Sequence, residues 1–177
     1  MEKNYKEYLQ QITTFIFDVD GVLTDGTLTI TTSGQMHRTM HTKDGFALKT
    51  AVEKGFHVCI ISGGTDEGVR KRLKGLGLAD VYLGAHHKDE IMDEYLEIND
   101  IKRENVLFMG DDIPDLYVMQ NIALPCCPQD AVPEIKEISR YVSHKKGGNG
   151  CVRDIIEQVL KVQGKWLNND HESARYD

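Results

Sequence analysis

The feature that most constrains this chain is an apolar run that stops abruptly at two carboxylates. Residues 15–17 read Phe-Ile-Phe, Asp18 and Asp20 follow two residues apart, and Gly21 lets the backbone turn. Side chains two apart on a strand point the same way, so both acids can lean over a strand's carboxyl end. Ligands bind at that end in open α/β sheets.

The same stretch has two other interpretations. An isolated pair of acids is equally compatible with an ordinary strand followed by an acidic turn. A calcium-binding loop also begins with alternating acids, but it needs glycine at its sixth position. Gly21 falls at the fourth position, so the calcium loop is excluded.

Strand-like and helix-like segments alternate along the rest of the chain. Apolar runs predict buried strands at 14–18, 57–61, 81–83 and 105–109 and edge strands at 122–124 and 141–142. Apolar residues at helical spacing, with capping and stop signals, predict helices at 3–11, 43–54, 65–75, 88–99, 132–138 and 152–160. This alternation predicts an α/β fold: a central, mostly parallel sheet with helices on both faces.

A hairpin interrupts the alternation directly after the two acids. Residues 27–32 alternate and are β-branched, Ser33-Gly34 marks a turn, and 35–41 lead back. We expect a β-hairpin at about 25–42 that projects from the rim of the site. The length of 177 residues suits a single domain, predicted at 1–164 and followed by a polar C-terminal tail at 165–177.

Composition narrows the possible partners. A net charge of −7 argues against a nucleic-acid partner, because phosphate backbones are held by clustered Lys and Arg. No apolar run reaches membrane-spanning length and the N-terminus lacks a signal-peptide pattern, so no membrane association is expected. The four cysteines lack metal-binding spacing and are expected to be reduced thiols in a cytoplasmic protein.

Polar residues follow the ends of several predicted strands. Parallel strands bring their carboxyl ends to one edge of the sheet, so the following residues are expected to converge: Asp18, Asp20, Ser62, Lys88, Asp111, Asp112 and Asp115. Neighbouring carboxylates repel one another, and a divalent cation relieves this. Carboxylate oxygens without His or Cys favour Mg²⁺.

This set of residues suggests phosphoryl transfer. Asp18 is the candidate nucleophile, and Asp20 the candidate acid and base that protonates the leaving alcohol and later deprotonates water. Ser62 and Lys88 are expected to hold the phosphoryl oxygens. Asp18, the backbone carbonyl of Asp20, and Asp111 are the candidate metal ligands. The adjacent pair His86-His87 has no third ligand at metal spacing and is interpreted as a solvated loop.

The order of these motifs resembles the haloacid dehalogenase superfamily of phosphatases. The matching segments are DVDGV at 18–22, Ser62, Lys88 and GDDxxD at 110–115, and together they span nearly the whole chain. The resemblance implies the roles just given, a three-layer Rossmann-like fold, substrate contacts from Gly63 and Gly64 beside Ser62 and Lys88, and a supporting role for Asp112 and Asp115 around the metal. The short segments between motifs leave no room for a cap domain.

Within that superfamily the chain looks most like the 3-deoxy-D-manno-octulosonate 8-phosphate (KDO 8-phosphate) phosphatases. The features that carry the likeness are DVDGVLTDG, the hairpin, residues 41–46, GDDxxD, the GGNG loop at 147–150 and residues 163–165. The resemblance implies a homotetramer in which a neighbouring subunit covers the site, and a role in lipopolysaccharide biosynthesis. Two positions depart from the pattern: Gly64, where those enzymes carry a basic residue, and Asn149, where Arg is common. Arg70, Lys71 or Arg72 is a candidate to compensate.

Two alternatives remain beside KDO 8-phosphate hydrolysis, and a third is excluded by the order of its motifs. The substrate can be a nine-carbon 2-keto sugar acid 9-phosphate of the sialic acid or KDN (2-keto-3-deoxynononate) type. The chain can be a non-catalytic oligomerisation module of a sugar-nucleotide synthetase, although it retains every motif residue. A receiver domain also gathers Asp, Ser or Thr, and Lys around Mg²⁺. Its phosphorylated Asp lies on a middle strand and its acidic pair follows the first strand, whereas here the candidate nucleophile Asp18 follows the first strand, so the order differs.

Overall fold

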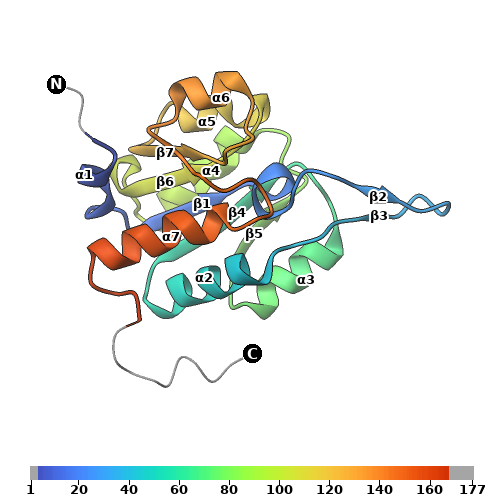
Figure 1. Cartoon of the computed structure of the whole chain (residues 1–177), viewed down its shortest axis with the longest axis horizontal. Coiled ribbons are helices and arrows are strands. Elements are labelled where there is room, and N and C mark those ends of the chain that lie inside the picture. Colours follow the sequence, from blue (N-terminus) through green and yellow to red (C-terminus); the bar gives the residue numbers. More distant parts are fainter. Residues whose placement is uncertain (1–3, 168–177) are drawn as a thin grey trace.

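The protein is built on one six-stranded parallel sheet (Figure 1). The structure is a computed structural model and describes residues 4–167. The strands are β1 (Thr14–Phe17), β4 (His57–Ser62), β5 (Asp80–Leu83), β6 (Val106–Met109), β7 (Leu124–Cys127) and β8 (Tyr141–Val142). Their order in the sheet is β5-β4-β1-β6-β7-β8, so the chain builds outward from β1 in one direction and then in the other. The predicted α/β fold is confirmed.

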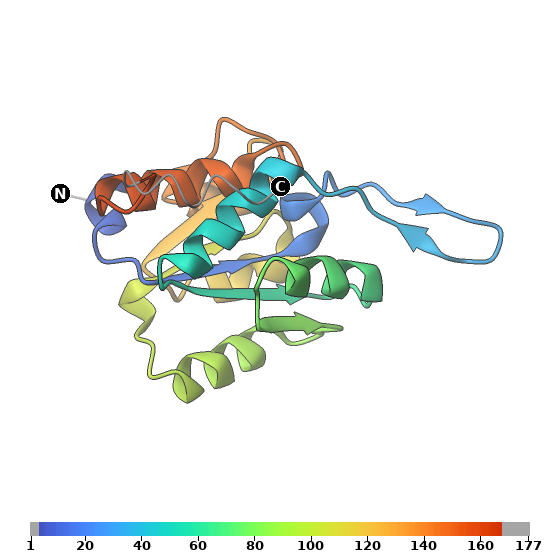
Figure 2. The ribbon, with the colours of Figure 1, turned by 90° about the horizontal axis from the view of Figure 1, so that it is seen from below.

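Helices cover both faces of the sheet, which gives three layers (Figure 2). One face packs against α1 (Lys6–Leu9), α2 (Thr42–Glu53), α3 (Glu67–Gly75) and α7 (Cys151–Val162). The other face packs against α4 (Lys88–Ile98), α5 (Leu116–Met119) and α6 (Pro133–Ile138).

The central strand shows why the sequence folds this way. Phe15 and Phe17 point into the core beneath α2 and α7, whereas Ile16 points into the core beneath α4 and α5. All three side chains are fully buried. A strand buried on both faces needs a continuous apolar run, because successive side chains enter opposite layers.

β1 also decides where a ligand can bind. The chain passes from β1 to β4 on one side and later to β6 on the other, so the strand order reverses at β1. The connections diverge there and leave a crevice beyond the carboxyl ends of the strands. Asp18 follows β1 directly and therefore stands at this crevice.

A hairpin projects from this edge of the sheet (Figures 1 and 2). Its paired strands are β2 (Thr29–Ile30) and β3 (Met36–His37), much shorter than the alternating sequence suggested. Its tip is closed by a bond from the Thr31 amide to the Gln35 carbonyl at 2.9 Å. Within residues 4–167, only the turn after β1, the hairpin, α2, β4, α3 and β5 separate the first three motifs, and no cap domain is present.

Two details differ from the expectations. The strand predicted at 122–124 is β7 (Leu124–Cys127), and it is a buried strand between β6 and β8 instead of an edge strand. Residues 165–167, assigned to the tail, still contact the domain, because the Trp166 ring meets Phe46 edge to face at 6.2 Å. The rest of the predicted tail lies outside the described residues. All four cysteines are free thiols, as expected, and all four are also buried.

Candidate active site

The turn after β1 presents the first carboxylate to the crevice. The Asp18 carboxylate accepts a hydrogen bond from the Val19 amide at 2.7 Å. The chain then makes one wide turn, closed by the Thr24 amide on the Val19 carbonyl at 3.0 Å. Gly21 has φ of +86°, and a Cβ there would lie 1.9 Å from a carboxylate oxygen of Asp111. Glycine is therefore required both by the backbone and by the neighbouring acid.

Lys88 connects the first motif to the last. Its Nζ lies 2.7 Å from Asp115 and 3.1 Å from Asp18, and its side chain is only 6% exposed. The other Asp115 oxygen accepts the Asp111 amide at 3.1 Å. Burial alone would lower the pKa of Lys88, but Asp18 and Asp115 outweigh it and raise this pKa. Lys88 is therefore a buried ammonium held between two acids.

Three carboxylates cluster where a metal ion could bind. Oxygen atoms of Asp18, Asp111 and Asp115 all lie within 4.8 Å of one another. Both Asp115 oxygens already accept hydrogen bonds, whereas within residues 4–167 no protein donor bonds to the Asp111 carboxylate. The three carboxylates carry more negative charge than the single ammonium of Lys88 balances. Their oxygen atoms are the kind of ligand that a divalent cation such as Mg²⁺ requires.

Burial and mutual repulsion shift the acidity of this cluster. In the metal-free protein, burial first and Asp115 second raise the pKa of Asp18 to about 6, against the opposing effect of Lys88. Burial, followed by the charges of Asp18 and Asp115, raises the pKa of Asp111 to about 7. A bound cation would reverse both effects, because it favours the ionised carboxylates.

All nine predicted site residues line one cleft of about 500 Å³. They are Asp18, Asp20, Ser62, Gly63, Gly64, Lys88, Asp111, Asp112 and Asp115. Ser62 is buried at the end of β4, and its hydroxyl accepts the Gly64 amide at 3.3 Å. His86, interpreted from sequence as a solvated loop residue, is exposed but also lines this cleft.

Asp20 stands apart from the carboxylate cluster. Its side chain is 35% exposed and pairs with Arg38, whose Nε and Nη2 donate to its two oxygens at 2.6 and 3.0 Å. This arrangement leaves only the backbone carbonyl of Asp20 as a candidate ligand, and the proton-transfer role of its side chain stays a prediction. Sequence reasoning missed Arg38, which lies 18 residues away on the returning side of the hairpin.

The residues named to compensate for Gly64 are not at the site. Arg70, Lys71 and Arg72 do not line the cleft, and Arg70 instead donates to the Val81 carbonyl at 2.7 Å. Gly64 has Arg38 as its neighbour: a Cβ at this position would lie 3.2 Å from Nη2 of Arg38. The basic group near the second motif therefore comes from the hairpin.

The glycine loop before α7 supports the turn from behind. The Gly148 amide donates to the Val22 carbonyl at 2.9 Å. A Cβ on Gly147 would lie 1.9 Å from the carbonyl oxygen of Gly21. Asn149 is exposed and lines a different hollow, beside His41 and Arg153. The GGNG loop thus packs on the backbone that carries the acids.

Known proteins are similar to this chain in sequence and in fold. The family of haloacid dehalogenase-like hydrolases matches residues 75–155. The chain is 34% identical to the 3-deoxy-D-manno-octulosonate 8-phosphate phosphatase KdsC of Salmonella typhi over 156 residues, which cover 88% of this chain and 83% of that protein.

Two solved structures extend the similarity to the fold. A 3-deoxy-D-manno-octulosonate 8-phosphate phosphatase from Yersinia pestis has a TM-score of 0.89 at 28% identity and covers 93% of this chain and 89% of its own. The enzyme from Moraxella catarrhalis, solved with a magnesium ion, a phosphate ion and a KDO molecule, has a TM-score of 0.88 at 27% identity and covers 92% and 93%.

The relatives named above are phosphatases, and the cleft of this chain gathers the residue types that phosphoryl transfer requires. Within residues 4–167, no helix is long and apolar enough to cross a membrane. The chain belongs to the haloacid dehalogenase-like phosphatases, in the family of the 3-deoxy-D-manno-octulosonate 8-phosphate phosphatases.

Proposed function

We propose that this protein is a Mg²⁺-dependent phosphomonoesterase that hydrolyses 3-deoxy-D-manno-octulosonate 8-phosphate to KDO and phosphate. The observation that carries the proposal is the Asp18 carboxylate, set beside Lys88 in a cleft with two further acids. The names of the relatives supply the substrate, because the cleft residues alone specify only a phosphoryl group.

The first step transfers the phosphoryl group to the protein. An Asp18 carboxylate oxygen attacks phosphorus, the bond from phosphorus to the sugar oxygen breaks, and its electron pair stays on that oxygen. Asp20, in its protonated form, donates a proton to this oxygen and so releases an alcohol. The product on the protein is an aspartyl phosphate at position 18.

The second step returns Asp18 to its starting state. Asp20, now a carboxylate, takes a proton from water as the water oxygen attacks phosphorus. The bond from phosphorus to the Asp18 oxygen breaks, and inorganic phosphate leaves. Asp20 is then protonated again, so each turnover regenerates both carboxyl groups.

The remaining cleft residues hold the phosphoryl group during both steps. Ser62 and Lys88 offer a hydroxyl and an ammonium to its oxygens, and the neighbouring Gly63 and Gly64 leave the backbone accessible to them. Asp18, Asp111 and the carbonyl of Asp20 would hold Mg²⁺, with Asp112 and Asp115 behind them. When bound, the cation neutralises the developing charge and lets the phosphate dianion approach the acids.

The organic part of the substrate needs space beyond the catalytic cleft. A second hollow of about 440 Å³ adjoins the cleft at Gly63 and Gly64 and is also lined by Gln35, His37 and Arg38. Without a cap, both hollows open to solvent. Polar side chains line part of both hollows, so they offer hydrogen-bond partners to the hydroxyl groups of an eight-carbon sugar acid.

We also propose that the protein works as a homotetramer in the cytoplasm, with a neighbouring subunit covering the site. The hairpin exposes Leu28, Ile30 and Met36, and Ile30 is 68% exposed. Exposed apolar side chains on a projecting element favour association. Four free buried thiols are consistent with a reducing compartment. A monomer in sedimentation velocity, measured on an active preparation, would contradict the tetramer.

The test of the proposed function is Mg²⁺-dependent phosphate release from KDO 8-phosphate. We expect EDTA to abolish turnover, Mg²⁺ to restore it, and Asp18→Asn to lose it. Asp93→Asn is the matched control, since Asp93 pairs with Arg103 on the surface away from the cleft. A higher kcat/KM for a nine-carbon sugar acid 9-phosphate would identify that compound as the substrate instead. Phosphate release that persists in Asp18→Asn would refute the mechanism.

A further inference from the structure

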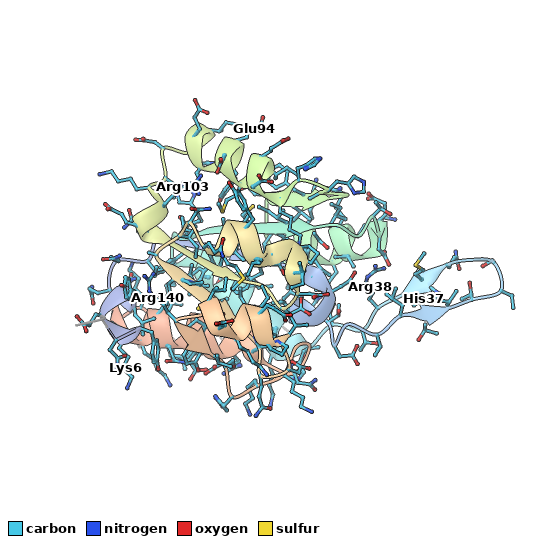
Figure 3. All side chains as sticks on the ribbon, turned by 90° about the horizontal axis from the view of Figure 1, so that it is seen from above. Lys6, His37, Arg38, Glu94, Arg103 and Arg140 are labelled. Carbon is cyan, nitrogen blue, oxygen red and sulfur yellow. The ribbon has the colours of Figure 1, made fainter. Side chains whose placement is uncertain are left out.

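The Arg38 side chain is largely covered although it belongs to an exposed hairpin. Its neighbours Met36 and His37 are exposed, whereas the Arg38 side chain is only 8% exposed. Figure 3 shows Arg38 where the hairpin joins the body of the protein, with His37 further out on the arm. Burying a guanidinium is costly unless its donors are satisfied, so its partners explain its position.

Those partners are two carboxylates from different loops and, more weakly, the Met36 carbonyl at 3.4 Å. The Arg38 guanidinium binds Asp20 through two parallel N–H groups, at 2.6 and 3.0 Å. Its Nη1 lies 3.3 Å from Asp66, which follows the second motif. A forked pair fixes the orientation of a carboxylate as well as its position, which a single ammonium does not.

Asp66 is itself held in place. Its other oxygen caps the N-terminus of α3 and accepts the amides of Gly68 at 2.6 Å and Val69 at 3.3 Å. Through Asp66, the guanidinium is therefore attached to α3, a helix of nine residues, while it also binds Asp20. Asp20 depends on this anchor, because its side chain has no other ion pair within residues 4–167.

Gly64 provides the space for this arrangement. A Cβ at position 64 would lie 3.2 Å from Nη2 of Arg38 and 3.4 Å from Oδ2 of Asp20. The first distance is tighter than ordinary van der Waals contact, so a larger side chain at 64 would displace the pair. The small residue at position 64 of the second motif thus leaves room for the arginine that the hairpin supplies.

We propose that Arg38 is a positioning residue that holds the Asp20 carboxyl group in the orientation needed for proton transfer to the leaving oxygen. This inference rests on the phosphatase function proposed above. Each carboxylate oxygen has two lone pairs, and Arg38 occupies one on each. The others remain directed away from Arg38 and carry the proton that Asp20 exchanges.

The test compares two substrates that differ in their need for a proton. KDO 8-phosphate is an alkyl phosphate, and its sugar oxygen leaves as an unstable alkoxide unless Asp20 protonates it. The leaving group of p-nitrophenyl phosphate is stable as an anion and needs no proton. We expect Arg38→Met to lower kcat/KM for KDO 8-phosphate about 10²-fold, the lower end of general acid catalysis. For p-nitrophenyl phosphate we expect a change of less than about threefold, because kcat/KM reports only the first irreversible step.

Three further variants separate positioning from folding and from substrate binding. Asp20→Asn should show the same selectivity, and the double variant Arg38→Met/Asp20→Asn should lose no more than Asp20→Asn alone. Asp66→Asn keeps a capping oxygen for α3 but weakens the anchor, so an intermediate loss is expected. Arg103→Met, which removes a surface ion pair, is the control for loss of an arginine.

The outcomes distinguish this inference from the proposed function. If the unaltered protein releases phosphate from neither substrate, the phosphatase proposal fails. If it is active but Arg38→Met lowers kcat/KM equally for both substrates, or adds its full loss to that of Asp20→Asn, Arg38 does not act through Asp20. Should Arg38→Met fail to fold, Arg38→Lys and Asp66→Asn make the same comparison, and equal losses on both substrates would overturn the inference.

Discussion

Replacing Gly147 with alanine tests whether the loop before α7 sets the position of the catalytic turn. A Cβ at residue 147 would lie 1.9 Å from the Gly21 carbonyl oxygen and 2.6 Å from its carbonyl carbon. Real Cβ contacts are essentially never shorter than 3.0 Å, and both atoms are backbone, so no flexible side chain can yield. Gly147 does not have a positive φ, so the substitution introduces crowding without backbone strain.

The size of the effect follows from the displacement. The loop and the turn must separate by about 1 Å, and a misplacement of that size costs roughly 10²-fold in rate. Because the Gly21 turn lies between Asp18 and Asp111, we expect kcat to fall about 100-fold and the Mg²⁺ concentration for half-maximal activity to rise. Overpacking of this kind also destabilises a fold by about 1–3 kcal/mol.

The assay is steady-state phosphate release at a range of Mg²⁺ concentrations, with the melting temperature measured in parallel. Gly75→Ala is the matched control, since a Cβ there would meet nothing within 4 Å. It should keep full activity and an unchanged or higher melting temperature. A Gly147→Ala protein with unaltered kcat and unaltered Mg²⁺ dependence would refute the idea that the loop braces the turn.

Three further predictions concern the acids and their lysine. Lys88→Met leaves Asp18 and Asp115 without their shared cation, so kcat should fall at least 10²-fold and the melting temperature in EDTA should drop, both measurable on one preparation. Gly21→Ala places a Cβ 1.9 Å from an Asp111 oxygen, and titration calorimetry should show weakened Mg²⁺ binding; unchanged affinity would exclude Asp111 as a ligand. The pKa of Asp18 is raised to about 6 and that of Asp111 to about 7, from 3.8. Between about pH 4 and pH 7 the folded, metal-free protein therefore binds more protons than the unfolded chain, and the stability contributed by these groups falls as pH rises. Melting temperatures in EDTA should decline over that interval and less so in Asp111→Asn, while Mg²⁺ should raise them most at pH 8; an equal decline in both proteins would contradict the assignment.

The layered fold and most of the cleft could be predicted from sequence for one physical reason. A strand buried on both faces must be apolar throughout, so the first polar residues after it mark the carboxyl edge of the sheet. Asp18, Ser62 and Asp111 were located in this way, and the parallel sheet brings them into one cleft. The pattern is local, and the convergence then follows from topology.

The sequence predicts the bounds and position of β7 wrongly because its composition is not typical of a buried strand. Its sequence is Leu-Pro-Cys-Cys, and Pro125 cannot donate to a ladder, which normally confines proline to edges or strand starts. Nevertheless β7 pairs with β6 on one side and β8 on the other. Burial of Cys126 and Cys127, rather than β propensity, makes this segment an interior strand, and that depends on helices packed from elsewhere in the chain.

Arg38 could not be located for a different reason. Its pair with Asp20 joins residues 18 apart, and its burial depends on where the hairpin leaves the domain. No periodicity marks such a residue: in sequence it is one arginine between a histidine and a threonine. The signal that existed was indirect, because an unusually small residue at position 64 beside a predicted anion site implies that another group occupies the space.

These differences show how the site divides between the sheet and its attachments. Asp18, Ser62 and Asp111 stand at or just after the ends of strands whose positions are fixed by the core. Asp20 has no such support: its carboxylate is partly exposed and is held by an arginine on the hairpin. The hairpin is also the element with the most exposed apolar side chains near the site. A contact that moves the hairpin therefore acts first on the Asp20 carboxylate, through Arg38, and leaves the carboxylates of the candidate metal site where the strands put them.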